Sequence, residues 1–162
     1  MAIEGSEPLP GVIVPCLVVA DVDEAMRFYQ TAFGAEELYR SPCAGGVGVH
    51  VNLRIWNSLV CLAQEEPQVR ADRVEYSMLA SPETLGGSTC IFQVRVPDAD
   101  EAFERAVRSG AAPTIPPSDM FWGDRYGLVQ DPFGYMWAIT TVQEVLKPAE
   151  IATRLSAAAG GR

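Results

Sequence analysis

Apolar residues recur at helical spacing in two stretches of the chain, and each stretch begins at an aspartate and ends at a glycine. The first stretch runs from Asp21 to Gly34 and the second from Asp98 to Gly110. A glutamate follows each aspartate by three positions, which is typical of a capped helix start, and the glycines suit the left-handed residue that ends a helix. The pattern predicts two helices with similar apolar faces, namely Ala25, Phe28, Tyr29 and Ala32, then Ala102, Phe103, Ala106 and Val107.

Each predicted helix follows one predicted strand and precedes three more. The first set of strands covers residues 12–19, 36–40, 46–55 and 58–64, and the second covers 88–96, 112–115, 126–130 and 135–141. The segment around Asp21 resembles the segment around Asp98, 77 positions later. The sequence therefore predicts a βαβββ unit that occurs twice, with tight turns at Trp56–Asn57 and at the Asp-Pro-Phe-Gly of residues 131–134.

This order predicts an α+β chain with a single domain over residues 1–162. Its first module spans residues 12–65 and its second spans residues 88–142. The polar residues 66–87 lack a clear period and are predicted to form a linker, and residues 143–158 are predicted to form a C-terminal helix.

Charge and composition exclude several classes of partner. The chain has 162 residues and a net charge of −9, which opposes binding to nucleic acid and to anionic membranes. We find no apolar stretch long enough to span a bilayer and no signal-peptide pattern at the N-terminus. Of the four cysteines, Cys16, Cys61 and Cys90 lie in apolar runs without a Cys-x-x-Cys pair, which predicts buried thiols in a reducing, cytoplasmic location.

Three segments resemble the vicinal oxygen chelate superfamily, which includes glyoxalase I, extradiol dioxygenases, fosfomycin-resistance enzymes and bleomycin-resistance proteins. They are PCLVVAD at residues 15–21, FYQTAFGAEEL at 28–38 and MFWGDRYGLVQDPFGYMW at 120–137. The last segment is similar to the PhnB-like branch, although Tyr135 stands where that branch commonly has histidine. The resemblance implies a curved mixed sheet around a cleft, a small-molecule ligand and a homodimer.

The resemblance also places the family's metal ligands on the first and last strand of each module. They align with Val14 and Cys61 in the first module and with Ile91 and Ala138 in the second, although a one-residue slip would replace Cys61 by Leu62. A divalent metal needs nitrogen, oxygen or thiolate donors, and a catalytic zinc typically has three from the protein. We therefore predict that the chain binds no metal and needs no cofactor.

Strand alternation predicts which side chains line the cleft. The inward residues are Val12, Val14, Cys16, Thr89, Ile91, Gln93, Arg95, Met136, Ala138 and Thr140, whereas Leu17, Val19, Phe92 and Val94 face the helices. A loop with Phe121, Trp122 and Arg125 is predicted to form a lid or a stacking wall for a planar ligand. The predicted ligand-binding residues are Val14, Cys16, Cys61, Ile91, Gln93, Arg95, Phe121, Trp122, Arg125, Met136 and Ala138. The same composition also suits a filled cleft, and Asp124–Arg125 also suits a structural ion pair.

Candidate acid–base residues are His50, Asp124 and Tyr126, with Asp119, Glu75 and Tyr76 as further options. Their spacing selects none of them, and His50 also suits a structural role. The function favoured by the sequence is metal-independent binding of a small, largely apolar or planar molecule, as in antibiotic-sequestering relatives. The alternatives are a metal-free lyase, isomerase or cyclase, and a diverged metal-dependent lyase or dioxygenase.

Overall fold

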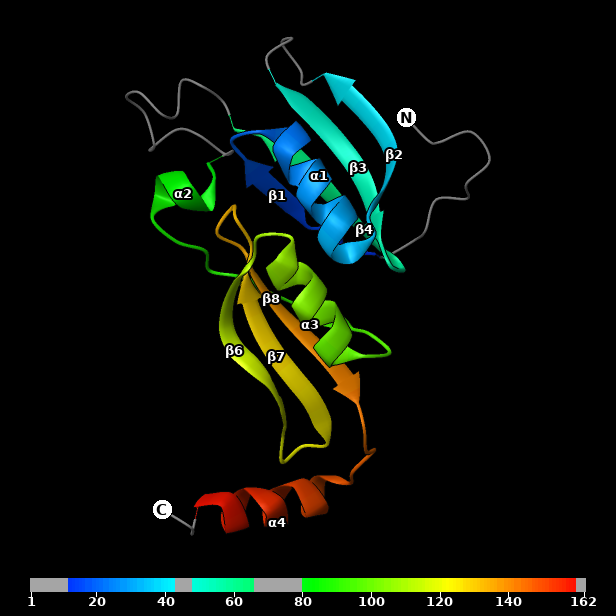
Figure 1. Ribbon diagram of the computed structural model, residues 1–162, viewed down its shortest axis with the longest axis vertical. Helices are drawn as coiled ribbons and strands as arrows, with labels where there is room; N and C mark the ends of the chain where they lie inside the picture. Colours follow the sequence, from blue (N-terminus) through cyan, green and yellow to red (C-terminus); the bar gives the residue numbers. More distant parts are fainter. Residues whose placement is uncertain (1–11, 43–47, 66–79, 160–162) are drawn as a thin grey trace.

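Two four-stranded sheets, each with one long helix on its face, make up most of the molecule (Figure 1). The computed structural model describes residues 12–42, 48–65 and 80–159. The first sheet has the order β1-β4-β3-β2 and the second has the order β5-β8-β7-β6. In chain order, the strands and longer helices of the molecule are β1 (Cys16–Val19), α1 (Val22–Phe33), β2 (Glu36–Pro42), β3 (Val49–Ile55), β4 (Ser58–Gln64), β5 (Ile91–Arg95), α3 (Ala99–Arg108), β6 (Ala112–Asp119), β7 (Asp124–Gln130), β8 (Met136–Val142) and α4 (Pro148–Ala159).

The strand register confirms the internal repeat. In the first sheet β1 runs parallel to β4, with Cys16 opposite Cys61. In the second sheet β5 runs parallel to β8, with Gln93 opposite Ala138. Both members of the second pair lie 77 positions after their counterparts in the first. The two modules therefore share the residue-by-residue pairing of their strands as well as their order of elements.

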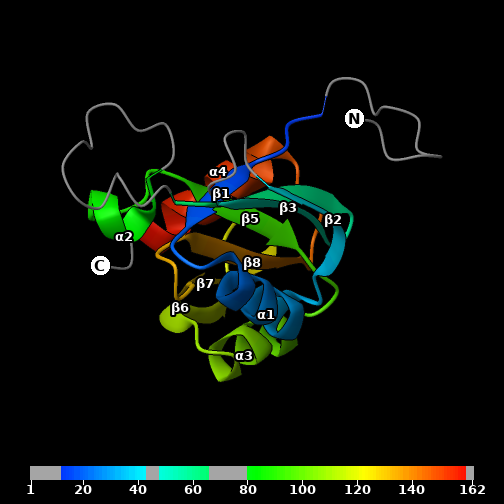
Figure 2. The ribbon, with the colours of Figure 1, turned by 90° about the horizontal axis from the view of Figure 1, so that it is seen from above.

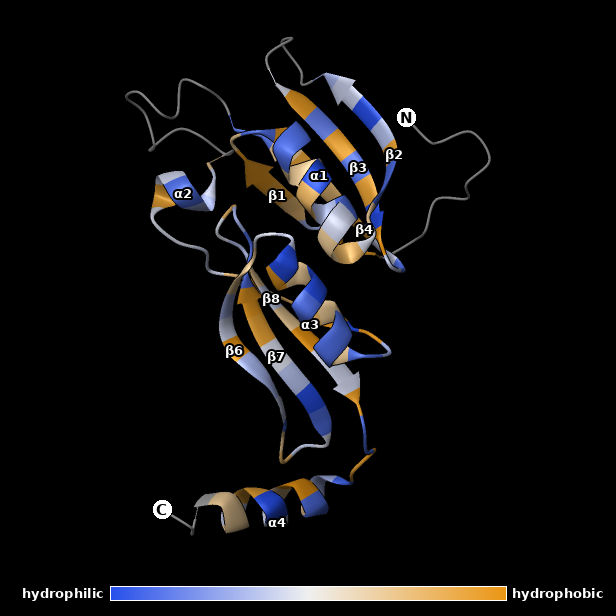
Figure 3. Cartoon of the chain, in the orientation of Figure 1, coloured by the Kyte–Doolittle hydropathy of each residue, from blue (hydrophilic) through white to orange (hydrophobic). Residues whose placement is uncertain are grey.

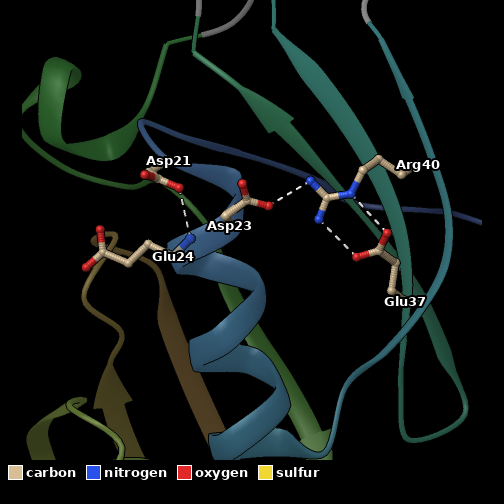
Figure 4. Close-up of polar contacts among 5 residues, drawn as sticks. All are labelled: Asp21, Asp23, Glu24, Glu37 and Arg40. Carbon is tan, nitrogen blue, oxygen red and sulfur yellow. Dashed lines mark hydrogen bonds and ion pairs between the residues drawn. The ribbon is translucent and has the colours of Figure 1, made fainter.

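Both predicted helix starts are confirmed. The Asp21 carboxylate accepts a hydrogen bond from the Glu24 amide at 2.9 Å, and Asp98 accepts one from the Glu101 amide at the same distance. Close to the first cap, Arg40 of β2 donates to Asp23 at 2.7 Å and to Glu37 at 2.9 Å (Figure 4). These contacts hold the edge strand β2 against the start of α1.

Helices α1 and α3 pack against each other on one side of the sheets, as Figure 2 shows from above. They cover side chains that alternate along the strands, such as Leu17 and Val19 of β1 and Val51 of β3, which are fully buried. Hydropathy follows this arrangement: β1 is apolar, whereas hydrophilic residues gather on the outer surface of α3 (Figure 3). We call the opposite side of each sheet its open face.

Asp131 joins the two modules through a buried carboxylate that is 4% exposed. One carboxylate oxygen accepts from the Tyr29 hydroxyl of α1 at 2.6 Å and from the Trp137 indole at 2.9 Å. The other accepts from the Phe133 and Tyr135 amides, both at 2.9 Å, within the predicted turn. Burial raises the pKa of Asp131, and the four donors oppose that rise.

Tyr135 makes a second connection between the modules, to the edge strand β1. Its hydroxyl accepts from the Val18 amide at 2.7 Å and donates to the Val18 carbonyl at 3.0 Å. Burial raises the pKa of Tyr135 to about 12, so the hydroxyl stays protonated at neutral pH and can donate. A third connection runs from the Arg105 side chain of α3 to the Ala32 carbonyl of α1 at 2.8 Å.

Several predicted element boundaries are wrong. The first strand starts at Cys16 rather than at residue 12, because Pro15 lacks an amide proton. The predicted linker contains a short helix, α2 (Pro82–Leu85), which Ser81 caps and Gly86 ends. β6 continues to Asp119 across two prolines, which an edge strand with register shifts tolerates.

The C-terminal helix α4 begins at Pro148, five residues later than its predicted start. Its Ile151 is half-buried and its Leu155 is 49% exposed. In the described part of the chain, we find no helix that is long and apolar enough to cross a membrane.

We expect Asp131→Asn to destabilise the protein by about 2–4 kcal/mol, because an amide nitrogen would face donors and leave a buried N–H unpaired. The Trp137 indole can only donate, so rotation of the new side chain does not relieve the conflict. Urea unfolding measures the free energy of unfolding of Asp131→Asn. The exposed Asp119→Asn is the control, and its unfolding free energy should fall by less than about 1 kcal/mol. Equal losses in the two variants would contradict the role assigned to Asp131.

Candidate functional site

The four positions aligned with family metal ligands do not form a donor set. Cys61 lies on the open face of the first sheet and Ala138 on that of the second, and the shared register excludes the slip to Leu62, which is buried beneath α1. Val14 and Ile91 are 41% and 58% exposed. Only Cys61 carries a metal-binding atom, and the described residues contain no group of three or more histidine, cysteine, aspartate or glutamate side chains that could hold an ion.

A pocket of about 400 Å³ lies in the seam between the modules. Its walls come from the segment before β1, from the β3–β4 hairpin and from β5 with one residue of β8. The lining is mainly apolar: Val12, Ile13, Val14, Pro15, Ile55, Leu59, Val60, Phe92, Val94 and Trp137, with Asn57, Ser58 and Gln93 as the polar members. This size and composition suit a small organic ligand with a few polar groups.

The pocket brings together only part of the predicted ligand-binding set. Val14 and Gln93 line it. Ile91 and Arg95 are exposed on β5, and on β8 Met136 lies opposite Ile91 and Ala138 opposite Gln93. Cys16 and Cys61 each follow a lining residue, Pro15 and Val60 respectively, without lining the pocket themselves.

Sequence reasoning missed the largest part of the pocket wall, namely Trp137, Phe92 and the hairpin of β3 and β4. Phe92 and Val94 do pack against the core, as predicted. They also border the pocket because β5 is an edge strand beside the seam. Alternation along a strand shows which face a side chain takes, and it carries no signal about which sheet edges meet.

The aromatic loop forms a cluster of its own at the start of β7. Phe121 meets Trp122 edge to face with ring centres 4.9 Å apart, and Trp122 meets Tyr126 at 6.0 Å. The Trp122 indole donates to the Asp124 carboxylate at 3.2 Å. Asp124 and Tyr126, two of the candidate acid–base residues, therefore lie together around Trp122.

Arg125 lies on the helix side of β7, away from this cluster. Its guanidinium donates twice to Asp100 of α3 at 2.8 Å and once to Asp119 of β6 at 3.0 Å. The guanidinium lowers the pKa of the Asp100 carboxyl. The ion pair predicted between Asp124 and Arg125 is thus replaced by pairs with two other aspartates, which hold α3 against its sheet.

His50 lies on the inner strand β3 of the first sheet, between Ala63 of β4 and Ser41 of β2. Among the described residues its Nε2 atom is buried without a hydrogen-bond partner. Asp124 and Tyr126 both lie on β7 of the second sheet, so His50 shares neither a strand nor a sheet with them. Glu75 and Tyr76 lie outside the described residues.

The prediction that the cysteines are buried is wrong for Cys16 and Cys90, which are exposed, and Cys61 is half-buried. Cys16 and Cys61 take the open-face positions of β1 and β4, on the side of the sheet opposite the buried Leu17 and Leu62. A hydrogen bond from Cys61 lowers the pKa of the Cys16 thiol to about 7, against the opposing effect of burial. A thiol whose pKa is lowered in this way forms more of the nucleophilic thiolate near neutral pH.

We expect alkylation of Cys16 by iodoacetamide to speed up as pH rises through about 7, because the reactive thiolate forms there. Replacing Cys61 by alanine removes the donor that stabilises the thiolate, so the midpoint should move upward and the rate at pH 7 should fall. Peptide mass spectrometry at each pH gives the rate at each cysteine, and Cys90→Ala serves as the control. A midpoint that Cys61→Ala leaves in place would contradict this assignment.

Known proteins share this architecture. The chain is 37% identical over 147 residues to an uncharacterized protein of Mycobacterium tuberculosis, covering 91% of this chain and 84% of that protein. Among solved structures, TioX from Micromonospora sp. ML1 is 29% identical with a TM-score of 0.58, covering 82% of this chain and 99% of TioX. The fosfomycin resistance protein FosX from Listeria monocytogenes shares the fold at 18% identity and a TM-score of 0.58, with coverage of 89% and 99%. The family model of the Glyoxalase/Bleomycin resistance protein/Dioxygenase superfamily matches residues 11–139, and the chain therefore belongs to this superfamily.

Proposed function

We propose that this protein binds a small, largely apolar or planar organic molecule in the seam pocket and does so without a metal. The observation that carries the proposal is the lining of the 400 Å³ pocket, in which apolar side chains surround three polar residues. Membership of a superfamily that includes bleomycin resistance proteins supports a ligand of this class.

The aromatic residues of the pocket favour a flat ligand. Phe92 is half-buried and borders the pocket, and its ring centre lies 5.1 Å from that of Trp137, which is only 2% exposed and supports Phe92 from behind through its hydrogen bond to Asp131. A ring that is fixed in place loses little conformational entropy when a ligand stacks on it. Gln93, Asn57 and Ser58 supply the donors and acceptors that would orient polar groups of the ligand.

The donor set supports metal-independent binding. Val14, Ile91 and Ala138 offer no ligand atom, and Cys61 alone cannot hold a divalent ion in a catalytic geometry. The reactions that the superfamily performs through a Lewis-acidic or redox-active metal are therefore not proposed for this chain. The homodimer, the PhnB-like branch and the cytoplasmic location implied by the sequence remain predictions.

Filling the pocket should weaken binding. We expect Val14→Trp to weaken binding of the apolar dye 1-anilinonaphthalene-8-sulfonate at least about tenfold, or ~1.4 kcal/mol, because the indole occupies the space of the ligand. Val145→Trp is the matched control, since Val145 is 94% exposed outside the pocket. Fluorescence titration of both variants measures the dissociation constants. Equal affinities, or equal losses, would contradict binding in the seam pocket.

Metal content tests the second half of the proposal. Protein that is purified without chelators, incubated with Zn²⁺, Ni²⁺, Mn²⁺ or Fe²⁺ and then desalted should retain each metal far below stoichiometric amounts. Elemental analysis measures the ratio of metal to protein. Stoichiometric retention of any of these metals that is lost in Cys61→Ala would overturn metal-independent binding. Native mass spectrometry of the fresh protein tests for an organic ligand independently of the metal result.

A further inference from the structure

We propose that Cys16 and Cys61 form a redox-active thiol pair that closes to a disulfide by exchange with a low-molecular-weight disulfide. The two residues lie directly opposite each other on the parallel strands β1 and β4. They share the open face of the sheet, so their side chains project on the same side. This inference does not depend on ligand binding in the pocket.

The strand geometry matches the requirements of a disulfide. Neighbouring strands lie about 4.8 Å apart, and the Cα atoms of disulfide-bonded cysteines are roughly 4.4–6.8 Å apart. Strand pairing at this point is regular, since the Cys61 amide donates to the Pro15 carbonyl at 2.9 Å. The Cα spacing expected for this pair therefore lies within the range that a disulfide spans.

Exposure assigns different roles to the two thiols. Cys16 is exposed on an edge strand, whereas Cys61 is half-buried on an inner strand. The depressed pKa of Cys16 supplies thiolate near neutral pH, as expected of an attacking group. Cys16 is thus the thiol that a dissolved disulfide reaches first, and Cys61 is placed to resolve the product.

The exchange balances in two steps. The Cys16 thiolate attacks one sulfur of the dissolved disulfide, whose S–S bond breaks and releases one thiolate. Cys61 then attacks the Cys16 sulfur of the mixed disulfide as a thiolate and releases the second small thiol. The protein loses two electrons and two thiol protons, and the dissolved disulfide gains them to become two thiols. In a reducing compartment the reverse exchange reopens the pair.

The test uses a chain with Cys43→Ser and Cys90→Ser, which keeps only the proposed pair, and oxidised glutathione as the probe. We expect both thiols to become unreactive to alkylation, the intact mass to fall by two hydrogens, and a peptide that joins Cys16 to Cys61. Dithiothreitol should restore both thiols. A persistent glutathione adduct, two unchanged thiols or a disulfide between two chains would each overturn the proposal.

Single replacements separate the attacking thiol from the resolving thiol. Adding Cys61→Ser should trap glutathione on Cys16, whereas adding Cys16→Ser should leave Cys61 modified much more slowly. Trapping on Cys61 at an equal rate would overturn the assignment of roles. Peptide mapping of the oxidised wild-type chain provides a measurement without substitutions, and there a disulfide between Cys16 and Cys61 supports the pair, whereas pairing with Cys43 or Cys90 contradicts it.

Discussion

The carboxylate of Asp131 is the interaction on which the arrangement of the two modules depends. It takes hydrogen bonds from α1 of the first module and from the turn and β8 of the second. A buried carboxylate without these donors would cost several kcal/mol, so turn, helix and strand must be in place together. Because Trp137 is one of the donors, the same carboxylate fixes a wall of the seam pocket.

The aromatic rings around this carboxylate extend its effect. Tyr29 and Trp137 lie with ring centres 5.7 Å apart, and Phe33 lies 4.8 Å from Trp137. Stacked and tilted contacts of this kind contribute modestly one by one but restrict each ring to a single orientation. The modules are therefore held by one polar centre within an apolar cluster, and the pocket lies where that cluster ends.

The repeat in the sequence predicted the fold well, because the order of helices and strands depends on local signals. These signals are the helix caps at Asp21 and Asp98, the helical spacing of apolar residues and the alternation along strands. It also predicted correctly which positions share the open faces, as Cys61 and Ala138 show. Each of these features is decided by neighbours in the chain or by the 77-residue register.

The contacts between distant segments were not predictable in the same way. The sequence marks residues 131–134 as a turn, yet nothing local shows that Asp131 accepts from Tyr29, 102 positions earlier. Likewise, the sequence analysis places Arg125 in a ligand-binding loop, but its partners Asp100 and Asp119 are visible only once α3 lies on the sheet. The exposure of Cys16 on β1 and of Cys90 just before β5 has the same cause, since an apolar run does not reveal that a strand lies at the edge of its sheet.

The hydroxyl of Tyr135 has a consequence for the behaviour of this protein at high concentration. Edge strands expose backbone donors and acceptors that can pair with a strand from another molecule and begin aggregation. On β1, the amide and the carbonyl of Val18 are both bonded to Tyr135, so a phenol takes the place that a foreign strand would need. A side chain of the second module thus blocks intermolecular strand addition at the first.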